Sequence, residues 1–312
     1  MYLSDYFDRQ GRFLCADARM STLSDEGDLE SDGKLETGHQ TDLALGSIGT
    51  ETFPRLSSTE LYDPASQYAR LLSIRARILR FAHSWAYGTP VGQRQAFAAY
   101  ASHRQMLRSW RDNLPVELEI KGRPPAVLGQ AAQLAELFSI HLWYLSSYSD
   151  LCVATLSTAL EAARRGFQAA APPHIVQAIQ DDCVEHAAEI LRLSNLVLTN
   201  YPTFVSRDRR ISVCLYQAIR ITVWDLFRHP SPSTEMKRST VALARGALVH
   251  LGAMAEVCPS SACRLGESLR LLENYGFTQY LIDLLPPEVF DVLSKAAGTK
   301  DDLSNDTAGQ PG

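Results

Sequence analysis

The chain has 312 residues, of which 46% are apolar, so it can fill the core of one large domain or of two small ones. Its formal net charge is −5, and no window of about 18 residues is apolar and free of charge, so no membrane-spanning helix is expected. Residues 1–60 carry 12 acidic and 5 basic side chains, whereas residues 61–300 carry 20 acidic and 25 basic ones. Because this basic excess is spread over many segments, direct sequence-specific DNA binding by this chain alone is not predicted.

Both ends of the chain are polar and acidic. Residues 20–60 are rich in Ser, Thr, Gly, Asp and Glu and poor in large apolar side chains. Such a segment buries too little surface to offset the entropy lost on ordering. We therefore expect residues 1–62 to be largely disordered or loop, residues 63–298 to form a helical domain, and residues 299–312 to be a disordered tail.

Helical spacing begins at Asp63. Asp63–Pro64 is typical of a helix start, because a carboxylate can cap free amides and proline is tolerated in the first turn. Apolar residues then recur every three or four positions, at Leu71, Ile74, Ile78, Phe81 and Trp85. A second helix is predicted to end near Pro115. Residues 116–121 alternate between apolar and charged between prolines, which predicts an extended connector.

The helix expected over about 126–163 is the most apolar of the chain. A helix that is apolar on most sides usually lies at the centre of a domain. Further helices are predicted after Pro173 and Arg207, from Ser231, after Pro259 and from Pro286. No regular series of strands and no fixed repeat is visible, so the sequence predicts an all-α fold, a multi-helix globular bundle or array.

The cysteines do not form a recognisable metal site. Their gaps are long and irregular apart from the pair Cys258 and Cys263, and a zinc cluster needs closely repeated Cys-x-x-Cys pairs. These two thiols with His250 could hold a metal ion, but loop thiols are the favoured interpretation. No Gly-x-Ser-x-Gly elbow and no phosphate-binding glycine loop is present. We expect neither a metal nor a cofactor.

One motif points toward an enzyme. Asp181, Asp182 and Glu185 resemble the acidic motif with which helical terpenoid synthases hold magnesium and a diphosphate. Carboxylates at this spacing can share a helix face, and their oxygens suit magnesium. Such enzymes need a second acidic motif on a facing helix, and we find none. A solvated helix face is favoured, and a magnesium-dependent terpenoid-synthase-like enzyme remains an alternative.

A basic cluster precedes one predicted helix. Arg207, Arg209 and Arg210 lie just before or within its first turn, where the helix dipole disfavours cations. A solvated cluster is favoured over one that meets an acidic partner or the acidic N-terminal segment.

Leu281, Leu284 and Leu285 form the Leu-x-x-Leu-Leu pattern with which helices dock in coactivator grooves. The same pattern arises in amphipathic helices, so core packing is the favoured interpretation and coactivator docking the alternative.

Three segments together resemble a known family. The first segment has the pattern Trp-x-x-x-Leu-Pro-x-x-Leu. The second is a helix that contains Leu-His and ends in Asp-Leu, followed by Cys152 where members of the family named below typically have tyrosine. The third is a helix with Cys, then Ala-Ala, then Ile. The matching residues are Trp110, Leu114, Pro115 and Leu118, then His141, Tyr144, Asp150 and Leu151, then Cys183, Ala187, Ala188 and Ile190. In order and spacing they resemble the all-helical regulatory domain, or middle homology region, of fungal zinc-cluster transcription factors, over about residues 65–230.

The resemblance implies a non-enzymatic regulatory domain that acts in the nucleus with other transcription-regulatory proteins. The zinc cluster, basic linker and dimerising coiled coil of that family are missing, so the chain resembles the C-terminal half of such a factor. A small-molecule effector would find its pocket at His141, Trp143, Tyr144 and Tyr148, because apolar sites with a few polar groups suit small ligands. For His141 a buried core histidine is the favoured interpretation. A ligand-free helical scaffold is the third alternative.

Overall fold

The structure is a computed structural model that describes residues 63–87, 93–120, 131–164, 172–202, 204–206, 208–228 and 231–289. The chain divides into two compact units, Met1–Asp63 and Pro64–Gly312, and all of the described helices belong to the second. The disorder predicted for residues 1–62 and 299–312 falls outside the described residues.

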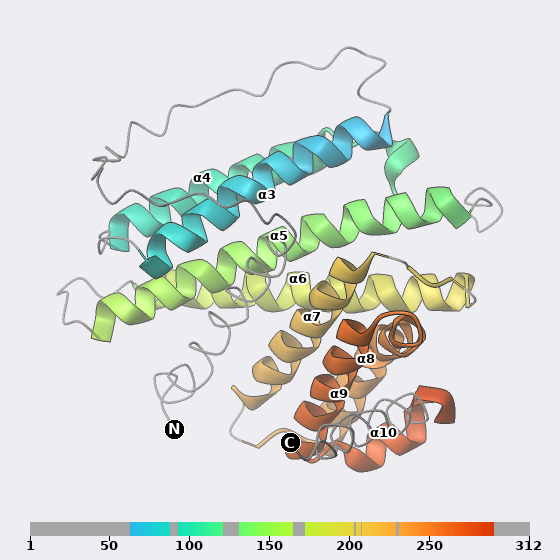
Figure 1. Cartoon of the computed structure of the whole chain (residues 1–312). Coiled ribbons are helices and arrows are strands. Elements are labelled where there is room, and N and C mark those ends of the chain that lie inside the picture. Colours follow the sequence, from blue (N-terminus) through green and yellow to red (C-terminus); the bar gives the residue numbers. More distant parts are fainter. Residues whose placement is uncertain are drawn as a thin grey trace, which may run out of the picture. The chain divides into compact units, whose positions relative to one another are not determined.

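Throughout the described ranges the regular structure is helical, and no strand occurs in them. The elements are α3 (Pro64–Tyr87), α4 (Gln93–Asp112), the short 3-10 helix η1 (Val116–Leu118), α5 (Ala131–Arg164), α6 (Pro173–Asn200), α7 (Arg209–Phe227), α8 (Thr234–Ala255), α9 (Pro259–Asn274) and α10 (Thr278–Leu284) (Figure 1). The predicted all-α array is therefore confirmed.

Helix α5 lies at the centre of this unit. It packs against α3, α4, α6 and α7, and Figure 1 shows it between the α3–α4 pair and α6. Leu137, Phe138 and Leu142 of α5 are fully buried, as expected for a helix that is apolar on most sides. Helix α6 continues the core, since it packs against α5, α7 and α8. Among the described helices, none combines the length and the apolarity that crossing a lipid bilayer requires.

Two helix boundaries differ from the sequence-based expectation. The connector after Pro115 begins as the 3-10 helix η1 and becomes extended only at Glu119. Helix α8 starts at Thr234 rather than at Ser231, because the side chain of Ser233 caps it by accepting from the backbone N–H of Met236 at 3.2 Å. A serine two positions further along the chain therefore performs the capping that we expected of Ser231.

Helix α10 was not predicted as a separate element. The chain reverses after α9 at Gly276, whose φ of 78° lies in the left-handed region that favours glycine. The N–H of Phe277 then bonds to the carbonyl of Leu272 at 3.0 Å, and its ring is fully buried. This turn places α10 against α8, ahead of the helix that we expected from Pro286.

Candidate functional site

A nearly buried cation lies against the most apolar helix. Nη1 of Arg75, on α3, is 2.7 Å from Oδ2 of Asp150 on α5. The guanidinium carbon is 4.3 Å from the centre of the Trp143 ring, and Nη1 also donates to the hydroxyls of Ser146 and Ser147 at 3.4 and 3.3 Å. Because the Arg75 side chain is only 15% exposed, the pairing with Asp150 is what makes its charge tolerable there.

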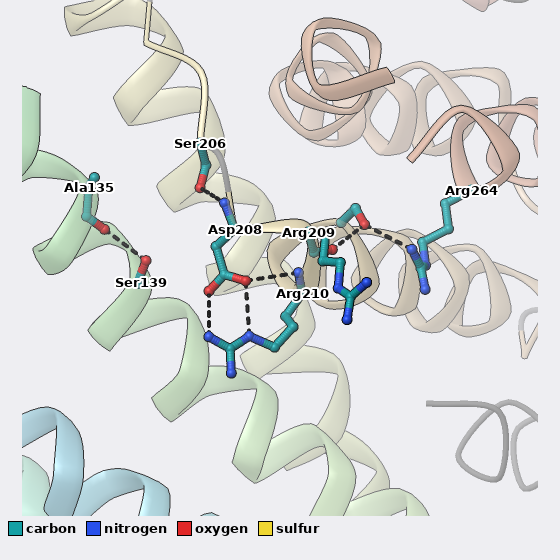
Figure 2. A network of polar contacts seen from close by, with 8 residues as sticks. Ala135, Ser139, Ser206, Asp208, Arg209, Arg210 and Arg264 are labelled. Atoms are coloured by element: carbon teal, nitrogen blue, oxygen red, sulfur yellow. Dashed lines mark hydrogen bonds and ion pairs between the residues drawn. The ribbon is translucent and has the colours of Figure 1, made fainter. Parts of the chain in front are cut away.

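A second cation reaches Trp143 from α7. The guanidinium carbon of Arg210 is 5.4 Å from the centre of the Trp143 ring. Figure 2 shows that Asp208 holds this arginine: its Oδ1 accepts from the backbone N–H and from Nε of Arg210, each at 3.0 Å. Asp208 is also the N-cap of α7, so its carboxylate offsets the unfavourable position of cations at a helix start. Arg207 of the predicted basic cluster lies outside the described residues.

The first turn of α7 is also tied to α9. The hydroxyl of Ser212 donates to the Arg209 carbonyl and accepts from Nη1 of Arg264 at 3.0 Å (Figure 2). Arg264 belongs to α9, and the same Nη1 donates to the Ser260 carbonyl at 3.3 Å. The start of α7 is therefore held from two sides, by Trp143 of α5 and by Arg264 of α9.

The junction of α3, α5 and α7 is our candidate functional site, defined by Arg75, Trp143, Asp150, Asp208 and Arg210. It combines two cations, two carboxylates and an aromatic ring. Burial is the main reason that the pKa values of the nearby Cys214 thiol and Tyr68 hydroxyl are raised. Both groups are thus protonated at neutral pH and supply no nucleophile. This arrangement suits recognition and positioning better than bond-making.

A second polar cluster joins α4 to α6. Oδ2 of Asp182 accepts from the Tyr100 hydroxyl at 2.8 Å and lies 2.7 Å from Nη2 of Arg104. The ring of His186 stacks on that of Tyr148, with centroids 4.0 Å apart and planes 10° apart. Burial lowers the pKa of His186, so its ring is neutral, and Nδ1 donates to the Asp182 carbonyl at 2.6 Å. The Asp182 carboxylate is therefore committed to structural contacts.

The carboxylates of the terpenoid-synthase-like motif are paired separately. Oδ1 of Asp181 is 3.3 Å from Nη2 of Arg228, the residue that follows α7. Oε1 of Glu185 is 3.0 Å from Nη1 of Arg192, and both belong to α6. Asp182 faces α4, as described above. Magnesium would need these oxygens to converge without competing cations. Within the described ranges no group of three or more acidic, His or Cys side chains could hold a metal ion.

The first two segments of the family resemblance contact each other. The ring of Trp110 stacks on that of Tyr144, with centroids 5.4 Å apart. The carbonyl of Leu118 lies 2.9 Å from Nε2 of His141, and His141 is 8% exposed. His141 is thus a buried histidine that hydrogen-bonds to the connector after α4.

The third segment meets the second through two buried thiols. Cys183 of α6 lies beside Cys152 of α5, and both are at most 2% exposed. Burial first, and then the neighbouring Cys183, raises the pKa of the Cys152 thiol. All three segments of the resemblance therefore contact α5, and the third meets it at Cys152, the position where this chain departs from the family's pattern.

The four residues predicted to line an effector pocket have different neighbours. Tyr144 and Tyr148 pack together, with ring centroids 5.5 Å apart and planes at 74°. Trp143 faces the arginines of α3 and α7, whereas His141 faces η1. Each contacts other side chains or backbone, so a ligand at these residues would have to displace existing contacts. The effector pocket remains a prediction.

The Leu-x-x-Leu-Leu segment lies on α10. Leu281 is 1% exposed and Leu285 is 6% exposed, whereas Ile282 between them is 62% exposed. The carbonyl of Leu284 accepts from Nε of Arg245 at 3.1 Å. Docking in a coactivator groove needs exposed leucines. In this position the two leucines belong to the core beside α8, and docking, which stays a prediction, would require α10 to detach.

The three residues considered as metal ligands, His250, Cys258 and Cys263, lie in different environments. His250 is 2% exposed and packs against Phe138 and Phe204, with ring centroids 5.7 and 6.2 Å away. Within the described residues neither ring nitrogen makes a hydrogen bond of good geometry, although the Gly246 carbonyl lies near enough to raise the pKa of His250 slightly. Cys258 lies at the N-cap of α9 and Cys263 is exposed on the same helix. The ring environment of His250 is apolar, which suits a neutral imidazole.

Sequence analysis did not single out several residues that carry these contacts, above all Arg75, Tyr100 and Arg104. Asp150 could have predicted a buried ion pair from the sequence, because a carboxylate within the most apolar helix needs a cation beside it. No sequence pattern identified Arg75 as that cation, because the pairing depends on how α3 crosses α5.

No family model, no curated protein and no solved structure matches the chain.

Proposed function

We propose that this chain is a non-enzymatic regulatory domain of a fungal-type transcription factor, acting in the nucleus with other transcription-regulatory proteins. The observation that supports it is the contact of the three family-like segments with one another. Trp110 meets Tyr144, Leu118 meets His141, and Cys183 of α6 adjoins α5. Residues that resemble one family in order and spacing thus occupy one continuous part of the core.

The polar clusters favour regulation over catalysis. Asp150 is paired with Arg75, and Asp182 with Arg104. A general acid or base needs a group whose proton can be exchanged near neutral pH. The buried thiol and phenol groups have raised pKa values and the buried His186 a lowered one. These groups therefore stay neutral at pH 7.

The junction of α3, α5 and α7 is the part of the domain where a regulatory signal would act. Ion pairs fix helix positions through a few discrete contacts, and such contacts can switch between alternative arrangements more readily than continuous apolar packing. An effector, or a regulatory protein, that competes for Arg75 or Arg210 would shift α3 or α7 relative to α5. The chain would then pass this change to a DNA-binding module supplied elsewhere.

Fusion of the full chain to a heterologous DNA-binding domain tests this proposal in a fungal reporter strain. We expect reporter expression to differ several-fold from that given by the DNA-binding domain alone. Arg75→Ala should alter that difference, whereas Arg238→Ala, which removes an exposed arginine of α8, should not. A folded fusion that leaves reporter expression unchanged would overturn the proposal, as would magnesium-dependent release of diphosphate from a prenyl diphosphate by the free chain.

A further inference from the structure

The thiol of Cys258 lies at the start of α9, between solvent and two serine side chains. Its Sγ is 3.1 Å from the Oγ of Ser260. Cys258 is the N-cap residue and Pro259 follows at the first helical position, so the free backbone N–H groups of the first turn lie near the sulfur. The preceding residue, Val257, is 70% exposed, so small molecules in solution have access to this turn.

Ser261 provides an independent observation at the same place. It is fully buried, and within the described residues its hydroxyl makes no hydrogen bond of good geometry, although it lies near the Cys258 sulfur. A buried hydroxyl without a partner is unfavourable, so such groups point to an interaction that another state of the protein supplies. Its hydroxyl lies close enough to the Cys258 sulfur to influence its ionisation. The thiolate form of Cys258, or an oxygen atom bound to its sulfur, would accept a hydrogen bond from the Ser261 hydroxyl.

The surroundings favour the ionised form of the thiol. Hydrogen bonding by the Ser260 hydroxyl is the largest cause that lowers the pKa of Cys258, and burial opposes it. The N–H and hydroxyl of Ser261 and the N–H of Ser260 lower this pKa further. The helix N-terminus acts in the same direction. Arg264 lies on this turn and donates to the Ser260 carbonyl, and the exposed Glu256 precedes Cys258 by two residues.

We propose that Cys258 is a site of oxidation to a sulfenic acid by small hydroperoxides, with Ser260 and Ser261 as its positioning residues. The thiolate sulfur attacks one oxygen of the hydroperoxide, so that an S–O bond forms while the O–O bond breaks. Sulfur is oxidised to a sulfenic acid and the peroxide is reduced. The alkoxide or hydroxide that leaves takes a proton from water. The Ser261 hydroxyl donates first to the thiolate and then to the new oxygen. This inference does not depend on the proposed function.

Cys263 is a matched control within the chain. It is also a free, exposed thiol on α9, but its sulfur faces the carboxylate of Glu267 at 3.7 Å instead of a helix N-terminus. Each unit by which a thiol's pKa falls raises its reaction rate at neutral pH about threefold, because a tenfold gain in thiolate is partly offset by lower nucleophilicity.

The experiment treats the full chain with hydrogen peroxide in the presence of dimedone, which traps sulfenic acids, and follows each cysteine by mass spectrometry. We expect the Cys258 adduct to form several-fold faster than the Cys263 adduct. Alkylation of Cys258 with iodoacetamide should reach half of its maximal rate at a lower pH than that of an ordinary exposed thiol, because its pKa is lowered. Ser260→Ala and Ser261→Ala should both slow Cys258 and leave Cys263 unchanged.

Ser260 is exposed, so its replacement tests the proposal even if Ser261→Ala impairs folding. In guanidinium chloride the preference for Cys258 should disappear, because it depends on the folded helix start. A Cys258 rate no higher than that of Cys263 in the native chain would overturn the proposal. So would a rate that Ser260→Ala leaves unchanged, or a preference that persists after unfolding.

Discussion

Gly246→Ala is expected to destabilise the domain by forcing α8 away from α6. A Cβ atom at this position would lie 2.6 Å from the backbone nitrogen and 2.8 Å from the Cα of Asn195, and these backbone atoms move only if the helix moves. Helices α6 and α8 approach so closely here that the side-chain amide of Asn195 hydrogen-bonds directly to backbone groups of α8. It donates to the Leu243 carbonyl at 2.6 Å and accepts from the Gly246 N–H at 2.9 Å.

The magnitude follows from three contributions. Overpacking of a close contact costs about 1–3 kcal/mol. Separation of the helices also breaks the two hydrogen bonds of Asn195, at about 1 kcal/mol each. The higher helix propensity of alanine returns about 1 kcal/mol. We therefore expect Gly246→Ala to lower the free energy of unfolding by about 2–4 kcal/mol.

Gly252→Ala is the matched control, because it makes the same change in the same helix. Its Cβ would meet Cγ2 of Val289 at 3.5 Å, an ordinary van der Waals contact. The helix propensity gain should then dominate, so this variant should be as stable as the parent chain or up to about 1 kcal/mol more stable. Urea unfolding followed by circular dichroism measures both. Equal free energies of unfolding for the two variants would refute the close approach of α6 and α8.

Burial lowers the pKa of His250 to about 4 from its ordinary value of 6.5, against a smaller opposing effect of the Gly246 carbonyl. As pH falls from about 6.5 to about 4 the unfolded chain therefore binds a proton that the folded chain does not, and the free energy of unfolding should drop by about 3 kcal/mol. His250→Leu should remove this part of the pH dependence in urea titrations, and an unchanged pH dependence would contradict the burial argument. Arg75→Ala should cost about 2 kcal/mol, because Asp150 loses its cation and the pair is only partly exposed to water, and an unchanged melting temperature would argue against this pairing. The chain alone should bind DNA weakly, with no sequence preference and with an affinity that falls as salt is added, whereas tight sequence-specific binding would contradict the proposed role. Asp181→Ala should leave the chain as inactive toward prenyl diphosphates as its parent, and turnover that this variant abolishes would revive the enzymatic alternative.

Sequence periodicity was sufficient for most of the helices because it reports which side of a segment is buried. The spacing after Pro173 predicted α6, and Ile179, Cys183, Ile190 and Val197 are all at most 2% exposed. The interpretation of His141 as a core histidine follows from the same logic, since a polar ring within an apolar stripe needs a nearby partner. Local pattern and burial are closely coupled in helices of this length.

Side-chain contacts between helices that are far apart in the sequence could not be predicted from the spacing of apolar residues. Nothing local identifies Arg75 as the partner of Asp150, or Asn195 as the side chain that inserts beside Gly246. These pairings depend on crossing angles between helices, which the identities of many side chains set jointly. The four aromatic and histidine positions of α5 were found to be buried, but their neighbours could not be foreseen from their spacing. His141 faces η1, Trp143 faces α3 and α7, Tyr144 stacks on a ring of α4, and Tyr148 stacks on a ring of α6.

Reporter expression from the full chain fused to a heterologous DNA-binding domain measures whether this helical unit regulates transcription. We expect expression that differs several-fold from that given by the DNA-binding domain alone, and a difference that Arg75→Ala changes while Arg238→Ala does not. A fusion that folds and occupies its DNA site yet gives the same expression as the DNA-binding domain alone would contradict the claim that this helical unit regulates transcription.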